Sequence, residues 1–186
     1  MKWIGNRVSY EDRKDFLTLI ISSSVDPWKM LVMLIWVLIW LSCGLVIFYF
    51  LFFTQELVDQ RIYFYIFLVF WTYYLFKVTR VLIWRRFGIE FIRIDEDNFS
   101  VKKSLWGYGR AKEFITNNIK KLKLSPLDDK SFSKVFNDSF WIVGQGTIVI
   151  NVLDIEYNFG SQISKEDGVK IIKVLNSKIN KIKSAS

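Results

Sequence analysis

The side chains of this chain that could perform acid–base chemistry are carboxylates, because its 186 residues include no histidine. Histidine is the commonest general base and metal ligand, so this chain lacks the residue on which most hydrolase and metalloenzyme mechanisms depend. Three acids that follow the apolar segments, Glu90, Glu113 and Asp154, are accompanied by Ser, Thr and Tyr hydroxyls but form no recognisable catalytic spacing. We therefore predict a protein that is not an enzyme and holds no cofactor and no metal.

Two other features of the sequence could take part in binding or covalent chemistry: a glycine-rich tripeptide and a single cysteine. The sequence Gly144-Gln145-Gly146 could belong to a phosphate-binding loop, but it lacks the strand-to-helix setting and the following Lys-Ser or Lys-Thr of such loops. A β-turn is the better interpretation. The single cysteine, Cys43, lies within an apolar run, so no disulfide can form within one chain.

Basic residues give the chain a net charge of +8 and gather beside its apolar segments. Each Lys or Arg near an anionic membrane surface contributes about 1 kcal/mol of attraction. The same residues are also ordinary determinants of membrane topology, so both interpretations stay open. The residues expected at lipid headgroups are Lys77, Arg80, Arg85, Arg86, Lys102 and Lys103.

Later lysines could contact nucleic acid, but a solvated strand edge and a solvated helix terminus explain them sufficiently. We expect no nucleic-acid partner. The lysines concerned are Lys120, Lys121, Lys123, Lys178, Lys181 and Lys183.

Two apolar segments predict a transmembrane hairpin. No charge interrupts Met30 to Phe53, which exceeds the roughly 20 residues that a spanning helix needs. The second segment is uncharged from Ile62 to Phe76, and its helix is expected to continue past Lys77 as a cytoplasmic stem. The first segment is too long, and begins too late, for a signal peptide.

Charge asymmetry predicts the orientation of this hairpin. The connection over residues 54–61 carries one basic residue, Arg61, and two acids, whereas both outer flanks are rich in Lys and Arg. Basic flanks stay on the cytoplasmic side. We expect a bacterial inner-membrane protein with both termini in the cytoplasm.

An aromatic face on the second span, Phe64, Phe67, Trp71 and Tyr74, follows helical spacing. We interpret it as a surface for an integral-membrane partner, with simple exposure to lipid as the alternative. The bilayer itself is the other expected partner.

Residues 1–27 are expected to form a cytoplasmic N-terminal segment. A weak capping signal at Ser9 and Asp12, followed by apolar residues from Phe16 to Ile21, predicts a short helix on the membrane surface. A helix or loop packed on the soluble domain is the alternative. Residues 28–86 would then form the hairpin with its stem, and residues 87–186 the cytoplasmic domain.

In that domain, alternating apolar residues and turn residues predict about seven antiparallel strands. The first two form a hairpin around the turn Asp95 to Asn98, and one of the later strands covers Ser139 to Val143. Ser164 and Asp167 then begin an amphipathic helix through Val169, Ile172, Leu175, Ile179 and Ile182. The fold class is therefore a membrane α-helical hairpin plus an α+β domain.

This order of seven short strands and one closing helix resembles the pleckstrin-homology-like fold in its bacterial form attached to a two-span anchor. The resemblance rests on GIEFIRIDEDNFSVKK, GTIVINVLDIEYNFG and SKEDGVKIIKVLNSKI. It implies a barrel or sandwich of strands capped by the C-terminal helix. It does not extend to inositol-phosphate recognition, because the first hairpin loop is acidic where such members carry basic residues.

These features predict a non-catalytic accessory, assembly or scaffold subunit of an inner-membrane complex. A membrane-surface module that responds to anionic lipid is the first alternative. A membrane-bound enzyme of unrecognised type is the second.

Overall fold

A computed structural model describes residues 1–53, 60–125, 139–144, 146–153 and 155–185. It divides into two compact units. The first, here called the β domain, combines Met1–Ser24 with Arg86–Ser186, and the second, the helical hairpin, is Val25–Arg85. The β domain is therefore discontinuous in sequence, with the hairpin inserted into it.

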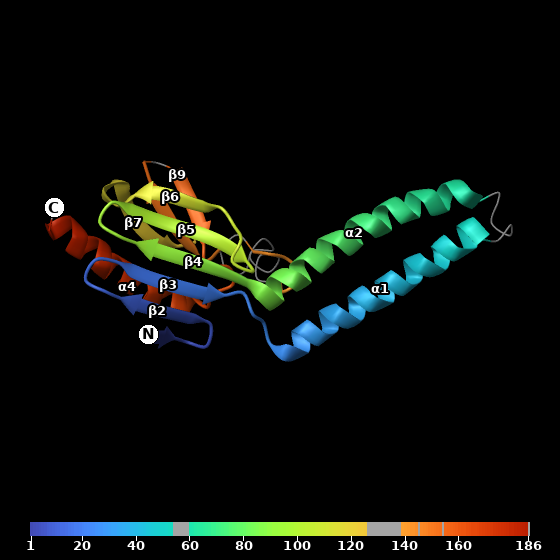
Figure 1. Cartoon of the computed structure of the whole chain (residues 1–186), viewed down its shortest axis with the longest axis horizontal. Coiled ribbons are helices and arrows are strands. Elements are labelled where there is room, and N and C mark those ends of the chain that lie inside the picture. The colour runs from blue at the N-terminus through green and yellow to red at the C-terminus, as the bar shows by residue number, and fades with distance from the viewer. Residues whose placement is uncertain (54–59, 126–138, 145, 154, 186) are drawn as a thin grey trace. The chain divides into compact units, whose positions relative to one another are not determined.

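The larger sheet of the β domain is a meander of six antiparallel strands, each paired with the next along the chain (Figure 1). Its strands come from both sides of the insertion: β1 (Lys2–Ile4), β2 (Val8–Asp12), β3 (Leu17–Ser22), β4 (Gly88–Ile94), β5 (Asn98–Leu105) and β6 (Ala111–Ile115).

The strands β3 and β4 are neighbours in this sheet although the whole hairpin separates them in sequence. Their register runs from Leu17 opposite Ile94 to Ser22 opposite Ile89. One more hydrogen bond, from the backbone N–H of Ser23 to the carbonyl of Gly88 at 3.0 Å, extends the ladder to the second-to-last residue before the insertion. The pairing is thus maintained up to the point where the chain leaves for the hairpin.

The smaller sheet contains β7 (Ile119–Leu124), β8 (Ile148–Val152) and β9 (Ile155–Phe159), and a 3₁₀ turn over Thr116–Asn118 precedes it. The C-terminal helix α4 (Lys165–Ala185) packs against β7 and β1. Ser164 caps it, because its Oγ accepts a hydrogen bond from the backbone N–H of Asp167 at 3.1 Å, as the sequence predicts.

The core of the β domain lies between the two sheets and α4. Phe99 of β5 and Phe159 of β9 are fully buried, with ring centroids 6.0 Å apart. Ile171 and Leu175 of α4 are buried in the same cluster. The predicted helix face is wrong at one position, because Val169 is 55% exposed and Ile171 takes its place in the core.

The helix predicted for the N-terminal segment is wrong, because residues 2–22 form strands. Leu17, Leu19 and Ile21 are buried while the residues between them are half-buried, which is the period of a strand. The alternative placed this segment on the soluble domain, and the segment does belong to that domain, although as strands and not as a helix or loop. The cause is partly non-local: β3 pairs with β2 on one side and with β4 on the other, and the N-terminal residues alone do not reveal the second partner.

The α+β class is confirmed, and the strands predicted after residue 87 match β4 to β9 with one exception. Residues 139–144 form a turn where a strand was expected, with the backbone N–H of Ile142 bonded to the carbonyl of Ser139. Among the residues that the structure describes, the strands form two separate sheets and do not close into a barrel.

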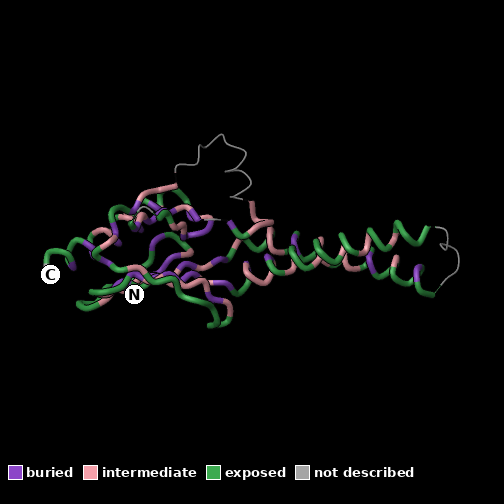
Figure 2. Tube along the Cα trace, turned by 90° about the horizontal axis from the view of Figure 1, so that it is seen from above, coloured by how far each residue is buried: buried purple, intermediate pink, exposed green. Residues whose placement is uncertain are grey.

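The helical hairpin contains α1 (Pro27–Phe53) and α2 (Arg61–Phe87), each of 27 residues and both long and apolar enough to cross a membrane. Only 11% and 6% of the residues in their most apolar windows are buried inside the protein. Figure 2 shows this exposure along both helices. A core helix of a soluble protein would bury one face, so exposure on this scale fits a lipid solvent.

We predict that Leu19→Ala lowers the free energy of unfolding of the β domain by about 2 to 5 kcal/mol, because it leaves a cavity beside Ile92 in the core. Chemical unfolding of the full chain in detergent, followed by circular dichroism of the strands, measures the loss. Ile155→Ala is the control, since Ile155 is 68% exposed. Equal losses in the two variants would contradict the assignment of β3 to the core.

Candidate functional site

The carboxylate with the most defined environment is Glu90 on β4. Strand alternation places it on the core face together with Ile92, and only 1% of it is exposed. Its Oε2 accepts a hydrogen bond from the backbone N–H of Gly160 at 2.6 Å. Its Oε1 accepts from the backbone N–H of Ser161 at 3.3 Å and lies 2.8 Å from the hydroxyl of that residue.

Two neighbours complete the surroundings of Glu90. Lys103, directly opposite on β5, places Nζ 3.8 Å from Oε1 and balances the charge. The pKa of Tyr157 is raised, chiefly because burial disfavours the phenolate and secondarily because Glu90 is negative. The carboxylate therefore connects β4 to the turn between β9 and α4, and its oxygens are occupied by protein donors. This is a structural role, since both oxygens are already engaged.

The other candidates for acid–base chemistry do not join Glu90. Glu113 is exposed on β6, and Asp154 lies outside the described residues. Gly146 has a φ of +120° and lies so close to β9 that a Cβ would meet the carbonyl oxygen of Phe159 at 2.5 Å. Together with Gly144, whose carbonyl lies 3.0 Å from the Ser161 hydroxyl, it belongs to a tight turn. Gln145 lies outside the described part of the chain.

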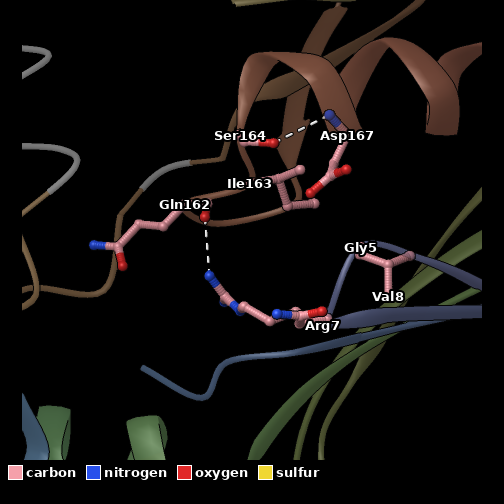
Figure 3. A pocket seen from close by; sticks show the side chains of 8 residues that line it. Gly5, Arg7, Val8, Gln162, Ile163, Ser164 and Asp167 are labelled. Carbon is pink, nitrogen blue, oxygen red and sulfur yellow. Dashed lines mark hydrogen bonds between the residues drawn. The ribbon is translucent and has the colours of Figure 1, made fainter. Parts of the chain in front are cut away.

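A pocket of about 320 Å³ lies where the β1–β2 turn meets the start of α4 (Figure 3). Arg7 points into it and donates to the carbonyls of Ser22 at 2.7 Å and Gln162 at 2.9 Å. Asp167 lines the opposite wall and pairs with Lys170 at 3.6 Å. Arg7 thus ties the β1–β2 turn to the end of β3 and to the turn that precedes α4.

Lys178 of α4 has a role that its sequence context did not reveal. Its position near the C-terminus predicts a lysine on a solvated helix terminus, but only 5% of it is exposed. Its Nζ donates to Asp12 Oδ1 at 3.1 Å and to the carbonyls of Arg13 and Lys14 at 2.5 and 2.9 Å. These three bonds use all the donors of the ammonium group and fix the β2–β3 turn on α4.

The six residues expected at lipid headgroups differ in their surroundings. Arg80 and Arg86 are exposed, and exposed Lys77 lies over the ring of Tyr73 with Nζ 5.4 Å from its centroid. Arg85 is buried. In the β domain, Lys103 pairs with Glu90 and Lys102 donates to the carbonyl of Gly107 at 2.9 Å.

The aromatic residues of α2 face in more than one direction. Phe67 and Trp71 point toward α1, where the Phe67 ring lies 6.3 Å from that of Trp40. Phe64 is half-buried and Tyr74 is 47% exposed. Two of the four residues assigned to an external partner are therefore engaged within the hairpin itself.

Reciprocal hydrogen bonds join the two helices at this level. Trp71 Nε1 donates to the carbonyl of Trp40 at 2.7 Å, and Trp40 Nε1 donates to the carbonyl of Trp71 at 3.1 Å. A helical carbonyl has a second lone pair for such a bond, and an indole N–H in lipid needs a partner. Gly44 makes the approach possible, because a Cβ there would lie 1.9 Å from the Trp71 ring. A glycine within an apolar span is the signal that could have revealed this contact.

No family model, curated protein or solved structure matches this chain. Its function is therefore inferred from the chemistry and exposure of its own residues.

We predict that Gly44→Ala destabilises the hairpin, because the new methyl group displaces the Trp71 ring and breaks its bond to Trp40. Thermal denaturation of the full chain in detergent should show a lower midpoint, with Cys43→Ala, at an exposed neighbouring position, as control. In a Trp71→Ala background Gly44→Ala should cost much less, since the obstructing ring is gone. Additive losses would disprove the contact.

We also predict that Glu90→Ala destabilises the β domain by about 1 to 3 kcal/mol, because it removes the acceptor of the buried backbone N–H groups of Gly160 and Ser161. Glu113→Ala, at an exposed position of β6, is the matched control and should be nearly neutral. Chemical unfolding measures both changes. A neutral Glu90→Ala variant would show that the carboxylate does not hold the β9–α4 turn.

Proposed function

We propose that this chain is a non-catalytic accessory, assembly or scaffold subunit of a protein complex in the bacterial inner membrane. The hairpin would join the complex within the bilayer, and the β domain would present a surface in the cytoplasm. The observation that carries the proposal is the outward surface of the hairpin, where large rings and aliphatic side chains remain exposed after the two helices have packed.

This outward surface is distinct from the inner face that holds Trp40 and Trp71. On α2 it includes Phe70 and Phe76, which are 60% and 70% exposed. On α1 it includes Phe48 and Phe52, whose rings lie 4.5 Å apart. Membrane helices associate by close packing of such shapes, since lipid tails supply no hydrophobic driving force between them. A ring-rich surface of this kind suits a protein partner.

The β3–β4 pairing supports the proposed orientation. Strands of one sheet cannot lie on opposite sides of a bilayer, so both flanks of the hairpin belong on the same side. Those flanks carry most of the basic residues near the hairpin, which favours the cytoplasmic side.

A pleckstrin-homology-like arrangement is the finer fold that we propose for the β domain. Counted from β3, seven antiparallel strands precede α4. The sequence resemblance also implies seven, but it counts them from Gly88 and includes residues 139–143, so β3 takes the place of that strand in the arrangement that we propose. The membrane hairpin would then be an insertion between the first two strands of that arrangement, with β1 and β2 as an N-terminal addition.

A non-catalytic role is supported by the way in which polar groups are used. Among the residues that the structure describes, Glu90 is the buried carboxylate, and its oxygens are bonded to Gly160 and Ser161. The buried ammonium of Lys178 likewise donates its hydrogen bonds to carbonyls of the β2–β3 turn. These groups stabilise the fold and leave no poised acid or base at their positions.

We predict that the tagged full chain, released from its native membrane by mild detergent, purifies with an integral-membrane partner in a complex of defined size. Phe70→Ala combined with Phe76→Ala should dissociate it, because these rings face outward. Phe67→Leu is the control, since Phe67 faces α1, and should retain the partner. A lone monomer without partner in the unmodified chain would refute the proposal.

A further inference from the structure

The turn between β5 and β6 displays two aromatic side chains to solvent. Trp106 is 62% exposed and Tyr108 is 84% exposed. Two backbone hydrogen bonds hold the turn: the N–H of Leu105 donates to the carbonyl of Tyr108 at 2.8 Å, and the N–H of Tyr108 returns to the carbonyl of Leu105 at 3.0 Å. The rings are thus presented on a fixed backbone.

The backbone of this turn does not favour tryptophan. Trp106 has a φ of 51° and Gly107 a φ of 85°, so both central residues are left-handed. Tight hairpin turns of this kind prefer Asn, Asp or Gly at the first position, and a bulky residue there is strained. Such an outlier indicates that the ring is retained for a purpose other than forming the turn.

The surroundings of the two rings are basic. Every charged residue from 98 to 112 is Lys or Arg. Arg110 is exposed beside the turn, and the ammonium of Lys102 is fixed at the turn by its bond to the carbonyl of Gly107. Rings flanked by cations are typical of the zone where a protein meets lipid headgroups.

The turn is also connected to the end of the second membrane helix. Trp106 packs on Phe87, the last residue of α2, with ring centroids 5.2 Å apart, and the guanidinium of Arg86 lies 5.8 Å from the Phe87 ring. A helix of 27 residues is about 40 Å long, close to the thickness of a bilayer with its headgroups. A span that starts with Arg61 in one headgroup layer is therefore long enough to bring Phe87 to the level of the other.

We propose that the Trp106–Tyr108 turn docks into the headgroup layer of an anionic membrane and fixes the β domain on that surface. The aromatic rings enter the interface, and Arg86 and Arg110 bind lipid phosphates. This inference rests on the proposed insertion of the hairpin, but it assigns the lipid contact to a turn of the β domain.

The single cysteine allows a direct test in vesicles of phosphatidylcholine and phosphatidylglycerol. In a Cys43→Ala background, a fluorophore at Tyr108→Cys should be quenched by a headgroup nitroxide severalfold more than one at Ile115→Cys. Ile115 is also exposed, but it pairs with Asn98 at the other end of the β5–β6 hairpin, about 20 Å along the strand. Quenching at position 108 should fall in pure phosphatidylcholine and at high salt.

Two variants in the Tyr108→Cys background separate docking from folding. Trp106→Asn should bring the quenching down to the level of position 115 while the unfolding midpoint stays equal or rises, because Asn suits this turn. Arg110→Gln should lower the ratio of docked to undocked domains about fivefold in anionic vesicles. Unchanged quenching in Trp106→Asn would overturn the inference.

The unmodified Cys43, labelled in the otherwise native chain, distinguishes this failure from that of the hairpin. Quenching at Cys43 by an acyl-chain nitroxide shows that the hairpin is inserted. If Cys43 is quenched while positions 108 and 115 respond equally, only the docking inference fails. If position 108 is shielded from both lipid nitroxide and a water-soluble quencher, a second copy of the chain covers the turn, and lipid docking is likewise overturned.

Discussion

The pairing of β3 with β4 is the constraint on which the rest of this structure depends. It joins two segments separated by the whole helical hairpin, so the N-terminal strands are part of the β domain. The connections are short: residues 23–26 precede α1, and β4 begins at the residue after α2. The chain consequently passes between the β domain and the hairpin twice.

Charges placed far apart in the sequence reinforce this pairing. Glu90 bonds to Gly160 and Ser161, and Lys178 bonds to the turn that precedes β3. Removing one partner of a buried polar pair costs much more than the pair contributes, so such contacts specify a single arrangement. Glu90 and Lys178, whose side chains could take part in acid–base chemistry, therefore serve to stabilise the fold.

Most of the correct predictions rest on residues that are close together in the sequence, such as turn residues, helix caps and uncharged apolar runs. The turn from Asp95 to Asn98 is closed by a hydrogen bond between their backbones, and Ser164 caps α4 through its own neighbour at Asp167. Both apolar helices were visible as uncharged runs. These elements depend on residues within a few positions of one another, which a sequence displays directly.

The errors arose where distant residues decide the outcome. The segment from Leu17 to Ser22 contains apolar residues at spacings that fit a helix or a strand, and its pairing with β2 on one side and with the distant β4 on the other makes it a strand. Lys178 resembles a surface lysine until Asp12 and its neighbours are placed beside it. Trp71 lies against Gly44 of α1, a neighbour that its own segment does not reveal. The residues next to each of these positions in the sequence do not predict such long-range contacts.

The inserted hairpin also sets an order of events during synthesis. The strands β1 to β3 leave the ribosome first, but β3 has no neighbour on its far side until β4 emerges about 65 residues later. At common rates of translation this delay is on the order of 3 to 13 s. Throughout it, the edge of β3 that faces away from β2 has no partner, so the six-stranded sheet can be completed only after the whole hairpin has been synthesised.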